Sequence, residues 1–227
     1  MFYPHKITRI APTDRVLEIG PGADPFHRSD VLLELRLPDE EDYVKQFGHD
    51  RKLQTDKPVV FYDGHEFPFK DKEFDYVICS HVLEHVPDVP QFLAEVFRVA
   101  KGGYFEYPLI TYEYMHNIGA HLNYVKWNGE VLYYLKKDQT PLNEFKPVQE
   151  FFFSTLINGY DEFYTRLPEF FFEGFEWDKP FHCEVNTEIK TYTDFGATVP
   201  MIRRDISKEQ TVRTLVKALV QKVKRKF

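Results

Sequence analysis

Two glycines and two acidic residues are spaced as a nucleoside-binding site would require. Gly20 and Gly22 follow the apolar run of residues 15–19, and glycines let a ligand approach the backbone where a side chain would block it. Glu34 ends a second apolar run, where its carboxylate could accept two hydrogen bonds from a ribose diol. Asp63 ends a third, in a position to meet an adenine amino group. Ligands of open α/β sheets bind at the carboxyl ends of the strands, so this order predicts a nucleoside site there.

A second set of reactive side chains follows Cys79. His81, Glu84 and His85 match the H-x-x-E-H pattern of inverted zinc peptidases. On a helix, the two histidines would lie one turn apart and could bind one zinc ion, with Glu84 as general base. The structural alternative makes His85 a buried histidine with a satisfied hydrogen bond and Glu84 an acid at a helix start. We favour this alternative because the pattern is short and directly follows an apolar strand, and we predict no metal ion.

The spacing of apolar residues predicts the elements that must position these groups. Short apolar runs indicate strands, and apolar residues at helical spacing indicate a helix over residues 89–99. Residues 38–54 have the pattern of a helix followed by a loop. Strands that alternate with helical segments predict parallel βαβ units in a doubly wound α/β sheet. The predicted strands are residues 15–19, 31–35, 58–62, 74–79 and 104–107.

The pattern changes after residue 108. Residues 109–180 are rich in Tyr and Phe and interrupted by prolines, which predicts a helical and irregular insertion. Residues 181–192 return to strand-like alternation, and residues 207–227 form an amphipathic helix with Ser207 as N-cap. We therefore predict one domain with three parts: a cofactor-binding half (1–108), a substrate cap (109–180), and final strands with a C-terminal basic helix (181–227).

From residue 16 to residue 107 the chain resembles the class I S-adenosylmethionine-dependent methyltransferases, in particular the small-molecule methyltransferase type 11 group. The pattern of that group is LEIGxG, an acidic residue after strand two, D-x-x-x-x-P-F before F-D-x-V, then VLEHV and a helix that ends in K-G-G. All of these elements are present and in order, at residues 17–22, 34, 63–69, 74–77, 82–86 and 101–103.

This resemblance implies a Rossmann-like fold with a seven-stranded, mostly parallel sheet and a reversed last hairpin. It also implies S-adenosylmethionine as cofactor. The methionine part would be flanked by Glu18, Gly20 and Gly22, the ribose bound by Glu34, and the adenine by Asp63 with Gly64 beside it. Ser80 and His81 would lie beside the reactive methyl group.

The first loop departs from the family pattern. Asp24 stands where a third glycine is usual, and only 11 residues separate Ile19 from Val31, too few for the usual first helix. The methionine end of the cofactor must therefore be covered by the insertion or by the N-terminal segment.

Methyl transfer to a hydroxyl group needs an aligned acceptor and a base. Histidine titrates near neutral pH, so His81, His116 and His121 are the predicted catalytic residues, with Glu106 and Tyr107 as further candidates at the end of strand five. We predict a small-molecule acceptor, methylated on oxygen and of the sugar or glycan-precursor class. The alternatives are a methyltransferase-like binding or scaffold protein that transfers no methyl, and a zinc hydrolase acting through His81, Glu84 and His85.

Aromatic residues make up 17% of the chain, and thirteen of them lie between Phe145 and Phe181. This cluster falls in the predicted cap, so three interpretations are open. It could form the wall of the acceptor pocket, the core of the cap, or the face of a homodimer, because interfaces are enriched in aromatic residues.

The distribution of charge along the chain limits the classes of partner that the protein can bind. The net charge is −7, yet residues 203–227 hold nine basic and two acidic groups, so the rest of the chain is acidic. An acidic body argues against nucleic-acid binding. We interpret the basic helix as a solvated face, with attraction of an anionic acceptor or peripheral contact with an anionic membrane as alternatives. We find no apolar run long enough for an integral membrane span. With two cysteines far apart and no signal-peptide pattern, we predict a cytoplasmic protein.

Overall fold

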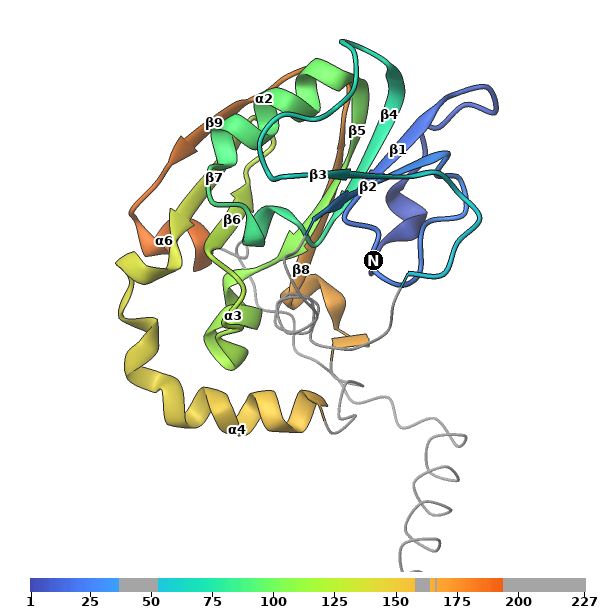
Figure 1. Cartoon of the computed structure of the whole chain (residues 1–227). Helices are drawn as coiled ribbons and strands as arrows, with labels where there is room; N and C mark the ends of the chain where they lie inside the picture. Colours follow the sequence, from blue (N-terminus) through green and yellow to red (C-terminus); the bar gives the residue numbers. More distant parts are fainter. Residues whose placement is uncertain (37–52, 158–163, 166, 194–227) are drawn as a thin grey trace, which may run out of the picture. The chain divides into compact units, whose positions relative to one another are not determined.

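The computed structural model describes residues 1–36, 53–157, 164–165 and 167–193, and statements about the structure concern these residues (Figure 1). The predicted basic helix over 207–227 and nearly all of the predicted helix and loop over 38–54 lie outside them.

A six-stranded sheet forms the centre of the described part, with strand order β3-β2-β1-β4-β5-β8 (Figure 1). The first five strands of this row pair in parallel, and β8 runs antiparallel to β5. The Rossmann-like, mostly parallel sheet is thereby confirmed, with six strands described in place of the predicted seven. Its strands are β1 (Val16–Ile19), β2 (Val31–Leu35), β3 (Val59–Tyr62), β4 (Phe74–Ser80), β5 (Ala100–Pro108) and β8 (Phe172–Trp177).

The central strands are buried on both faces, as their unbroken apolar sequences predict. All four residues of β1 are buried, and so are most of β4 and β5. β5 begins at Ala100, earlier than expected, because Gly102 and Gly103 open this strand rather than end the preceding helix. At Gly103 an added Cβ would lie 2.5 Å from Val77, so the close approach of β4 requires a glycine there.

A second sheet has three strands, in the order β6-β7-β9. β6 (Asn123–Trp127) pairs antiparallel with β7 (Val131–Lys136), and β9 (His182–Val185) pairs parallel with β7. The strand expected within residues 181–192 is thus β9, and it joins this second sheet. The strand that completes the central sheet is β8, which the sequence analysis assigned to the cap. The division of the domain at residues 108 and 180 stays a prediction.

Gly174 explains why β8 fits beside β5. An added Cβ at Gly174 would lie 2.2 Å from the hydroxyl of Tyr104 on β5, so only glycine leaves room for that buried ring. In the sequence, aromatic residues occur before, within and after β8 without a regular spacing. The strand therefore could not be recognised from an alternating pattern.

The helix α2 (Val89–Val99) confirms the predicted helical spacing. Asp88 caps it by accepting a hydrogen bond from the backbone N–H of Gln91 at 3.0 Å, and its apolar stripe faces the core. The remaining helices are short apart from α4: η1 (Pro4–Lys6), η2 (Leu83–His85), α3 (Ile110–His116), η3 (Lys137–Gln139), η4 (Pro141–Phe145), α4 (Lys146–Ile157), η5 (Pro168–Phe170) and α6 (Ile189–Thr193).

The aromatic cluster divides between core and surface. Phe172 and Trp177 of β8 are buried, and Phe175 stacks on Trp127 with ring centroids 4.3 Å apart. On α4, by contrast, Phe151 is 64% exposed and Phe153 is 37% exposed. Part of the cluster therefore serves the core, while α4 presents phenylalanines at the surface of the described part.

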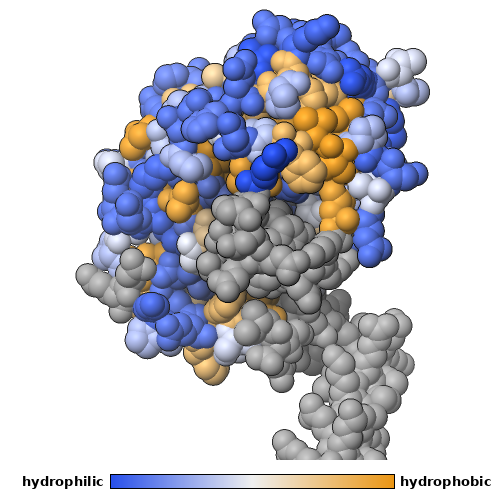
Figure 2. Space-filling model, in the orientation of Figure 1, coloured by the Kyte–Doolittle hydropathy of each residue, from blue (hydrophilic) through white to orange (hydrophobic). Residues whose placement is uncertain are grey.

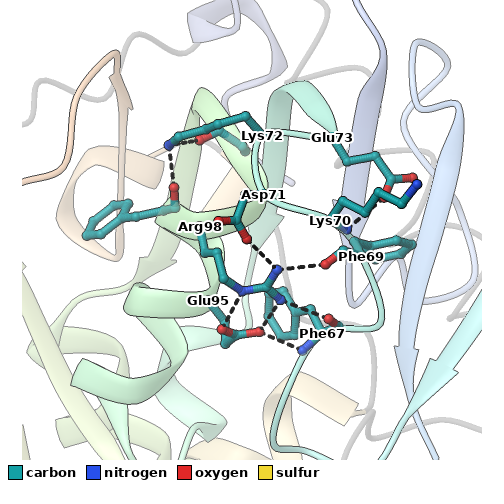
Figure 3. Close-up of polar contacts among 10 residues, drawn as sticks. Phe67, Phe69, Lys70, Asp71, Lys72, Glu73, Glu95 and Arg98 are labelled. Carbon is teal, nitrogen blue, oxygen red and sulfur yellow. Dashed lines mark hydrogen bonds and ion pairs between the residues drawn. The ribbon is translucent and has the colours of Figure 1, made fainter.

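The loop that leads into β4 is held by one guanidinium group (Figure 3). Arg98 of α2 donates hydrogen bonds to the carbonyls of Phe67 and Phe69, at 2.9 and 2.6 Å, and pairs with Glu95. Glu95 in turn accepts from the backbone N–H of Phe67 at 2.7 Å. This network fixes the path of the chain between Asp63, at the end of β3, and β4.

Figure 2 shows hydrophilic residues over most of one face and a hydrophobic area where the β3 edge of the sheet lies in Figure 1. Phe61 of β3 is 51% exposed. None of the described helices reaches the length and apolar character that a membrane span requires.

Replacing Arg98 by lysine should destabilise the protein by about 1–3 kcal/mol, because lysine keeps the charge but loses the planar fork that serves several acceptors. Urea denaturation measures the change. The matched control is Arg15→Lys, a half-exposed residue with an ion pair to Glu73, for which we expect a change of about 1 kcal/mol or less. Equal effects of the two substitutions would show that the Arg98 network does not hold the loop.

Candidate active site

The glycine turn after β1 has the backbone that a close ligand approach requires. Gly20 and Gly22 have positive φ angles of 62° and 60°, a conformation that side-chain-bearing residues rarely adopt. A Cβ on Gly20 would lie 2.7 Å from Cγ2 of Val82, whereas a Cβ on Gly22 would meet nothing within 4 Å. Gly20 is thus required by packing as well as by backbone geometry, while Gly22 faces open space.

Side chains hold the short loop between β1 and β2 in place of the usual helix. Glu18 is 5% exposed, and its carboxylate accepts from the backbone N–H of Phe26 at 2.8 Å and from the hydroxyl of Ser29 at 2.6 Å. Lys57, which precedes β3, donates to the carbonyls of Phe26, His27 and Ser29. Burial raises the pKa of Glu18 despite these hydrogen bonds, so keeping its carboxylate ionised in the folded protein costs free energy.

A cavity of about 700 Å³ opens beside this loop, at the carboxyl ends of β1 and β4. Its volume lies within the range of small-molecule sites. The predicted residues Glu18, Gly20 and Ser80 line it, together with residues of the N-terminal segment. Two covers were expected for this end of the site. Among the described residues, it is the N-terminal segment that lines the cavity, through Met1, Pro4, Ile7 and Ile10.

A smaller cavity of about 100 Å³ shares Gly20 with the first. It is lined by Glu34, Tyr62, Gly64 and His81, so it collects the residues predicted for the ribose and for the end of β3. Asp63 is exposed and accepts a hydrogen bond from the backbone N–H of His65 at 3.1 Å. Burial raises the pKa of Glu34 to about 7, although the N–H of Leu35 donates to its carboxylate.

These residues fit S-adenosylmethionine, the predicted cofactor. At Gly20 an added Cβ would occupy the space beside the backbone. The two cavities that share Gly20 have Glu18 and Ser80 in the wall of one and Glu34 in the wall of the other. Glu34 is half-buried, and one of its carboxylate oxygens accepts a hydrogen bond from the neighbouring N–H of Leu35. Its carboxylate can therefore still accept hydrogen bonds from a diol.

Glu106 of β5 is a fully buried carboxylate that gathers donors from three parts of the chain. The backbone N–H groups of Phe2 and Tyr3 donate to it at 2.7 and 2.9 Å. The hydroxyl of Tyr104 donates at 2.7 Å, and Ser80 and His81 donate from the end of β4 at 3.2 and 3.1 Å. This carboxylate thereby ties the N-terminal segment to the predicted methyl-transfer edge.

His81 lies between two carboxylates. Its Nε2 is 3.1 Å from Glu106 and its Nδ1 is 3.3 Å from Glu84. Burial alone would lower the pKa of His81, but the hydrogen bonds and charges of Glu106 and Glu84 raise it to about 9. The imidazole is therefore protonated at neutral pH, with both N–H groups engaged. Its φ of 59° is unusual for a residue other than glycine and marks local strain.

The three histidines predicted as catalytic lie in different cavities. His81 lines the 100 Å³ cavity, His121 a cavity of about 530 Å³, and His116 a third of about 120 Å³. Burial lowers the pKa of His116 to about 4, and its Nε2 is hydrogen-bonded to Tyr164. His116 and His81 are thus not brought together around one reacting atom.

The 530 Å³ cavity adjoins the small one, because Pro87 lines both. Its other lining residues include His121, Lys136, Lys137 and Lys146 together with Asp138, so the described wall carries more basic than acidic groups. The 700 Å³ and 100 Å³ cavities share Gly20, and the 100 Å³ and 530 Å³ cavities share Pro87, and we call these the row of three cavities. Sequence reasoning did not find this basic wall, because its lysines are scattered along a segment with no motif.

The family comparison matches residues 38–105 to a methyltransferase domain. Over these residues the match agrees with the resemblance to the class I S-adenosylmethionine-dependent methyltransferases that the sequence motifs predicted, and with the predicted cofactor. It begins after Glu34, so the glycine turn and the first acidic residue are placed by the sheet topology and the cavities rather than by the match.

Similar chains cover only part of this one. An uncharacterized protein of Methanocaldococcus jannaschii is 29% identical over 98 residues, which is 43% of this chain and 44% of that protein, so the match spans less than half the length of this relative. Among solved structures, a methyltransferase of Thermotoga maritima is 22% identical with a TM-score of 0.32, and covers 47% of this chain and 49% of that chain. One from Mesorhizobium loti is 14% identical with a TM-score of 0.39, over 73% and 91%.

Replacing Glu106 by glutamine should destabilise the protein by about 3 kcal/mol at pH 7. Burial alone would raise the pKa of Glu106, but His81 and the Tyr104 hydroxyl lower it to about 2 from 4.5. A depressed carboxyl pKa stabilises the fold above pH 4.5, and this contribution is lost as the pH falls toward 2. The difference between wild type and variant should therefore shrink below pH 4.5.

Urea denaturation at several pH values tests this dependence. Glu184→Gln is the control, because this exposed residue of β9 pairs only with His182 and should have no comparable effect. A stability difference for Glu106→Gln that stayed constant from pH 7 to pH 3 would contradict the assigned charge.

Proposed function

We propose that this chain transfers the methyl group of S-adenosylmethionine to a hydroxyl group of an anionic small molecule, of the sugar or glycan-precursor class. The observation that carries the proposal is the row of three cavities. Two of them are lined by five of the seven residues predicted for the cofactor, namely Glu18, Gly20, Glu34, Gly64 and Ser80. The third, next in the row, has a wall with three lysines. A phosphate or carboxylate on the acceptor would complement that wall.

The residues of the first two cavities bind and orient the cofactor in this proposal. Bound S-adenosylmethionine supplies an activated methyl group on a sulfonium. Glu18 shapes the loop beside its methionine part, and Gly20 and Gly22 let the backbone approach it. Glu34 accepts from the ribose diol, and Asp63 and Gly64 lie beside the adenine. Ser80 stands at the end of β4, where the family resemblance puts the reacting centre.

The lysines of the third cavity bind and orient the acceptor. Lys136 donates to the carbonyl of Pro87 at 2.5 Å, and burial lowers its pKa. Lys146 stands at the first residue of α4, 3.9 Å from Glu150, and Lys137 pairs with Glu113 at 2.9 Å. Lys136 and Lys146 are therefore the better candidates for binding an anion, since Lys137 is already neutralised by a buried carboxylate.

The three predicted histidines have different roles in this proposal. His121 lines the acceptor cavity, so we place it beside the acceptor, and its catalytic role stays a prediction. His81, protonated and engaged at both nitrogens, orients Glu84 and Glu106 as a positioning residue. The catalytic role of His116 stays a prediction.

The cellular location of the protein, its self-association and its membrane contact rest on fewer observations. Both Cys79 and Cys183 are free thiols, which agrees with the predicted cytoplasmic location. The exposed phenylalanines of α4 offer a surface for the homodimer that was one of the three interpretations of the aromatic cluster. Peripheral membrane contact through the basic residues 207–227 stays an alternative to a solvated helix.

Binding of S-adenosylmethionine should become tighter as the pH rises through about 7. Below this value Glu34 is largely protonated in the free protein, and accepting both hydrogen bonds of a diol requires it to lose the proton. Calorimetry at pH 6.5 in buffers of different ionisation enthalpy should show net proton release on binding. Glu34→Gln should abolish the release and weaken binding about tenfold, whereas Glu130→Gln, at an exposed position, should preserve both. Binding without proton release by the wild type would contradict the role of Glu34.

A methyl-transfer screen tests the acceptor class. Nucleoside diphosphate sugars and sugar phosphates should be methylated, and neutral sugars and phenols should react at least tenfold more slowly. Lys136→Met and Lys146→Met should raise KM for the acceptor about tenfold with little change in kcat, because the lost contact is equal in the ground and transition states. Lys101→Met, an exposed surface variant, is the control.

Three outcomes would oppose the proposal in different ways. Equal rates with neutral acceptors would remove the anionic class. Cofactor binding with no transfer to any acceptor would favour the non-catalytic binding or scaffold alternative. No cofactor binding at all would contradict the activity itself.

A further inference from the structure

In contrast to the absence of a metal ion that we predicted from the sequence, we infer that Glu84, His85 and His121 bind a divalent metal ion of the zinc type. One ligand atom from each of the three residues lies within 4.8 Å of the other two, which is the spacing that a single ion can bridge. Two of these residues come from the H-x-x-E-H sequence, but the third lies 36 positions downstream and replaces the first histidine of that pattern.

The two segments that carry the ligands are joined by their backbones. The N–H of Leu122, next to His121, donates to the carbonyl of Glu84 at 2.6 Å. The side-chain amide of Asn123 donates to the carbonyls of Leu83 and Val86, at 2.9 and 2.8 Å, on either side of Glu84 and His85. The start of β6 is thereby fixed against η2, so the relative position of the three ligands is determined by secondary structure.

Glu84 supplies a second observation that points to a cation. Its side chain is 1% exposed, and neither of its carboxylate oxygens has a hydrogen-bond partner in the described part of the chain. His81 pairs with one oxygen at 3.3 Å, which leaves the other unpaired. The imidazolium of His81 compensates part of this charge, but the buried oxygen that it does not pair with is costly unless a cation faces it.

Both histidines are oriented in the manner of metal ligands. His85 Nδ1 is hydrogen-bonded to the carbonyl of Ala120 at 3.0 Å, and His121 Nδ1 is hydrogen-bonded to the carboxylate of Glu113. Each ring is thus held with its proton on Nδ1, which leaves the lone pair of Nε2 for a ligand. A carbonyl or carboxylate behind the ring is the usual outer partner of a metal-bound histidine.

Glu113 strengthens the case for His121. This carboxylate is fully buried and pairs with Lys137 at 2.9 Å in addition to His121. The rings of His85 and His121 are perpendicular, with centroids 4.6 Å apart. Two imidazoles this close, each with an unused nitrogen, are readily explained by a shared ion.

The structure also explains why His81 does not belong to the ligand set. η2 contains only Leu83–His85, so His81 and His85 are not one turn apart on a helix. His81 has a left-handed backbone instead, and both of its nitrogens face the carboxylates of Glu84 and Glu106. The peptidase geometry suggested by the sequence pattern is therefore not formed, and the metal set is built across two segments.

Three protein ligands leave a coordination position for an exogenous oxygen, as in catalytic zinc sites. His85 lines the small cavity that holds Glu34, and His121 lines the lysine-rich one. The ion would thus stand between the predicted cofactor and acceptor sites. Contact of the ion with an acceptor hydroxyl, whose pKa it would lower, rests on the proposed function, but binding of the metal does not.

The experiment uses the full chain stripped of metal with a chelator and then titrated with zinc chloride. Equilibrium dialysis with elemental analysis should find about one zinc per chain, and cobalt should give the visible absorption of a low-symmetry, four-coordinate site. Circular dichroism before and after stripping monitors folding. Zinc content no higher than in a metal-free buffer blank, with no cobalt spectrum, would overturn the inference.

Substitutions test the ligand set. His121→Ala and His85→Ala should weaken zinc binding at least a hundredfold, and Glu113→Gln, which removes the outer partner of His121, about ten- to a hundredfold. His182→Ala, at an exposed histidine of β9, should have no effect. His81→Gln should change zinc binding less than tenfold. Loss of zinc in His81→Gln but not in His121→Ala would refute this set and favour the H-x-x-E-H set.

Zinc binding and methyl transfer can fail separately. One zinc per chain with no methyl transfer would leave the metal site standing and contradict the proposed function. Methyl transfer by a metal-free chain at the full rate would contradict the assigned contact of the ion with the acceptor. Should a ligand variant fail to fold, Glu113→Gln and the cobalt spectrum of the wild type still decide the inference.

Discussion

The buried carboxylate of Glu106 is the interaction on which the site depends. A carboxylate with no exposed surface is stable only when hydrogen bonds and an opposite charge compensate its desolvation. Here the compensation comes from the N-terminal segment, from Tyr104 beside it on the sheet, and from His81 at the end of β4. The same contacts that satisfy the charge fix the N-terminal segment over the carboxyl ends of the strands. The cavity wall formed by the N-terminal segment, the end of β4 and the buried charge of Glu106 therefore depend on one another.

The shortened loop after β1 shows how a fold tolerates the loss of a helix. A helix satisfies its own backbone and covers the sheet, whereas a bare loop must find partners elsewhere. Glu18 supplies an acceptor for this loop, and Lys57 supplies one cation for three of its carbonyls. Both partners are single side chains, and the loop that they hold lines the 700 Å³ cavity through residues 24–28.

Much of the sheet could be predicted from the sequence, because β1, β2, β4 and α2 have apolar patterns that burial imposes locally. β8 could not be predicted: its place depends on a glycine that meets a tyrosine about 70 residues earlier in the chain, and no local pattern records that contact. The acidic residues of the cofactor edge were found because they end apolar runs. The protonation states of the histidines could not be predicted. His81 is protonated because of Glu84 and Glu106, which lie 3 and 25 positions away in the sequence, and His116 is neutral because it is buried.

The contact between the first residues and β8 has a consequence for how the chain acquires its shape during synthesis. Phe2 stacks on Phe172 with ring centroids 3.7 Å apart, and the hydroxyl of Tyr3 donates to the carbonyl of Phe172, 169 residues later. On the ribosome, strands β1 to β5 can pair as they emerge, but the outer edge of β5 stays open until β8 is made. The N-terminal segment can bind Glu106 once β5 is made, but its contacts with Phe172 must wait for β8. The wall of the 700 Å³ cavity is therefore completed late in translation, and nascent chains that stop before residue 172 would expose both an unpaired strand edge and the ring of Phe2 without its stacking partner to chaperones.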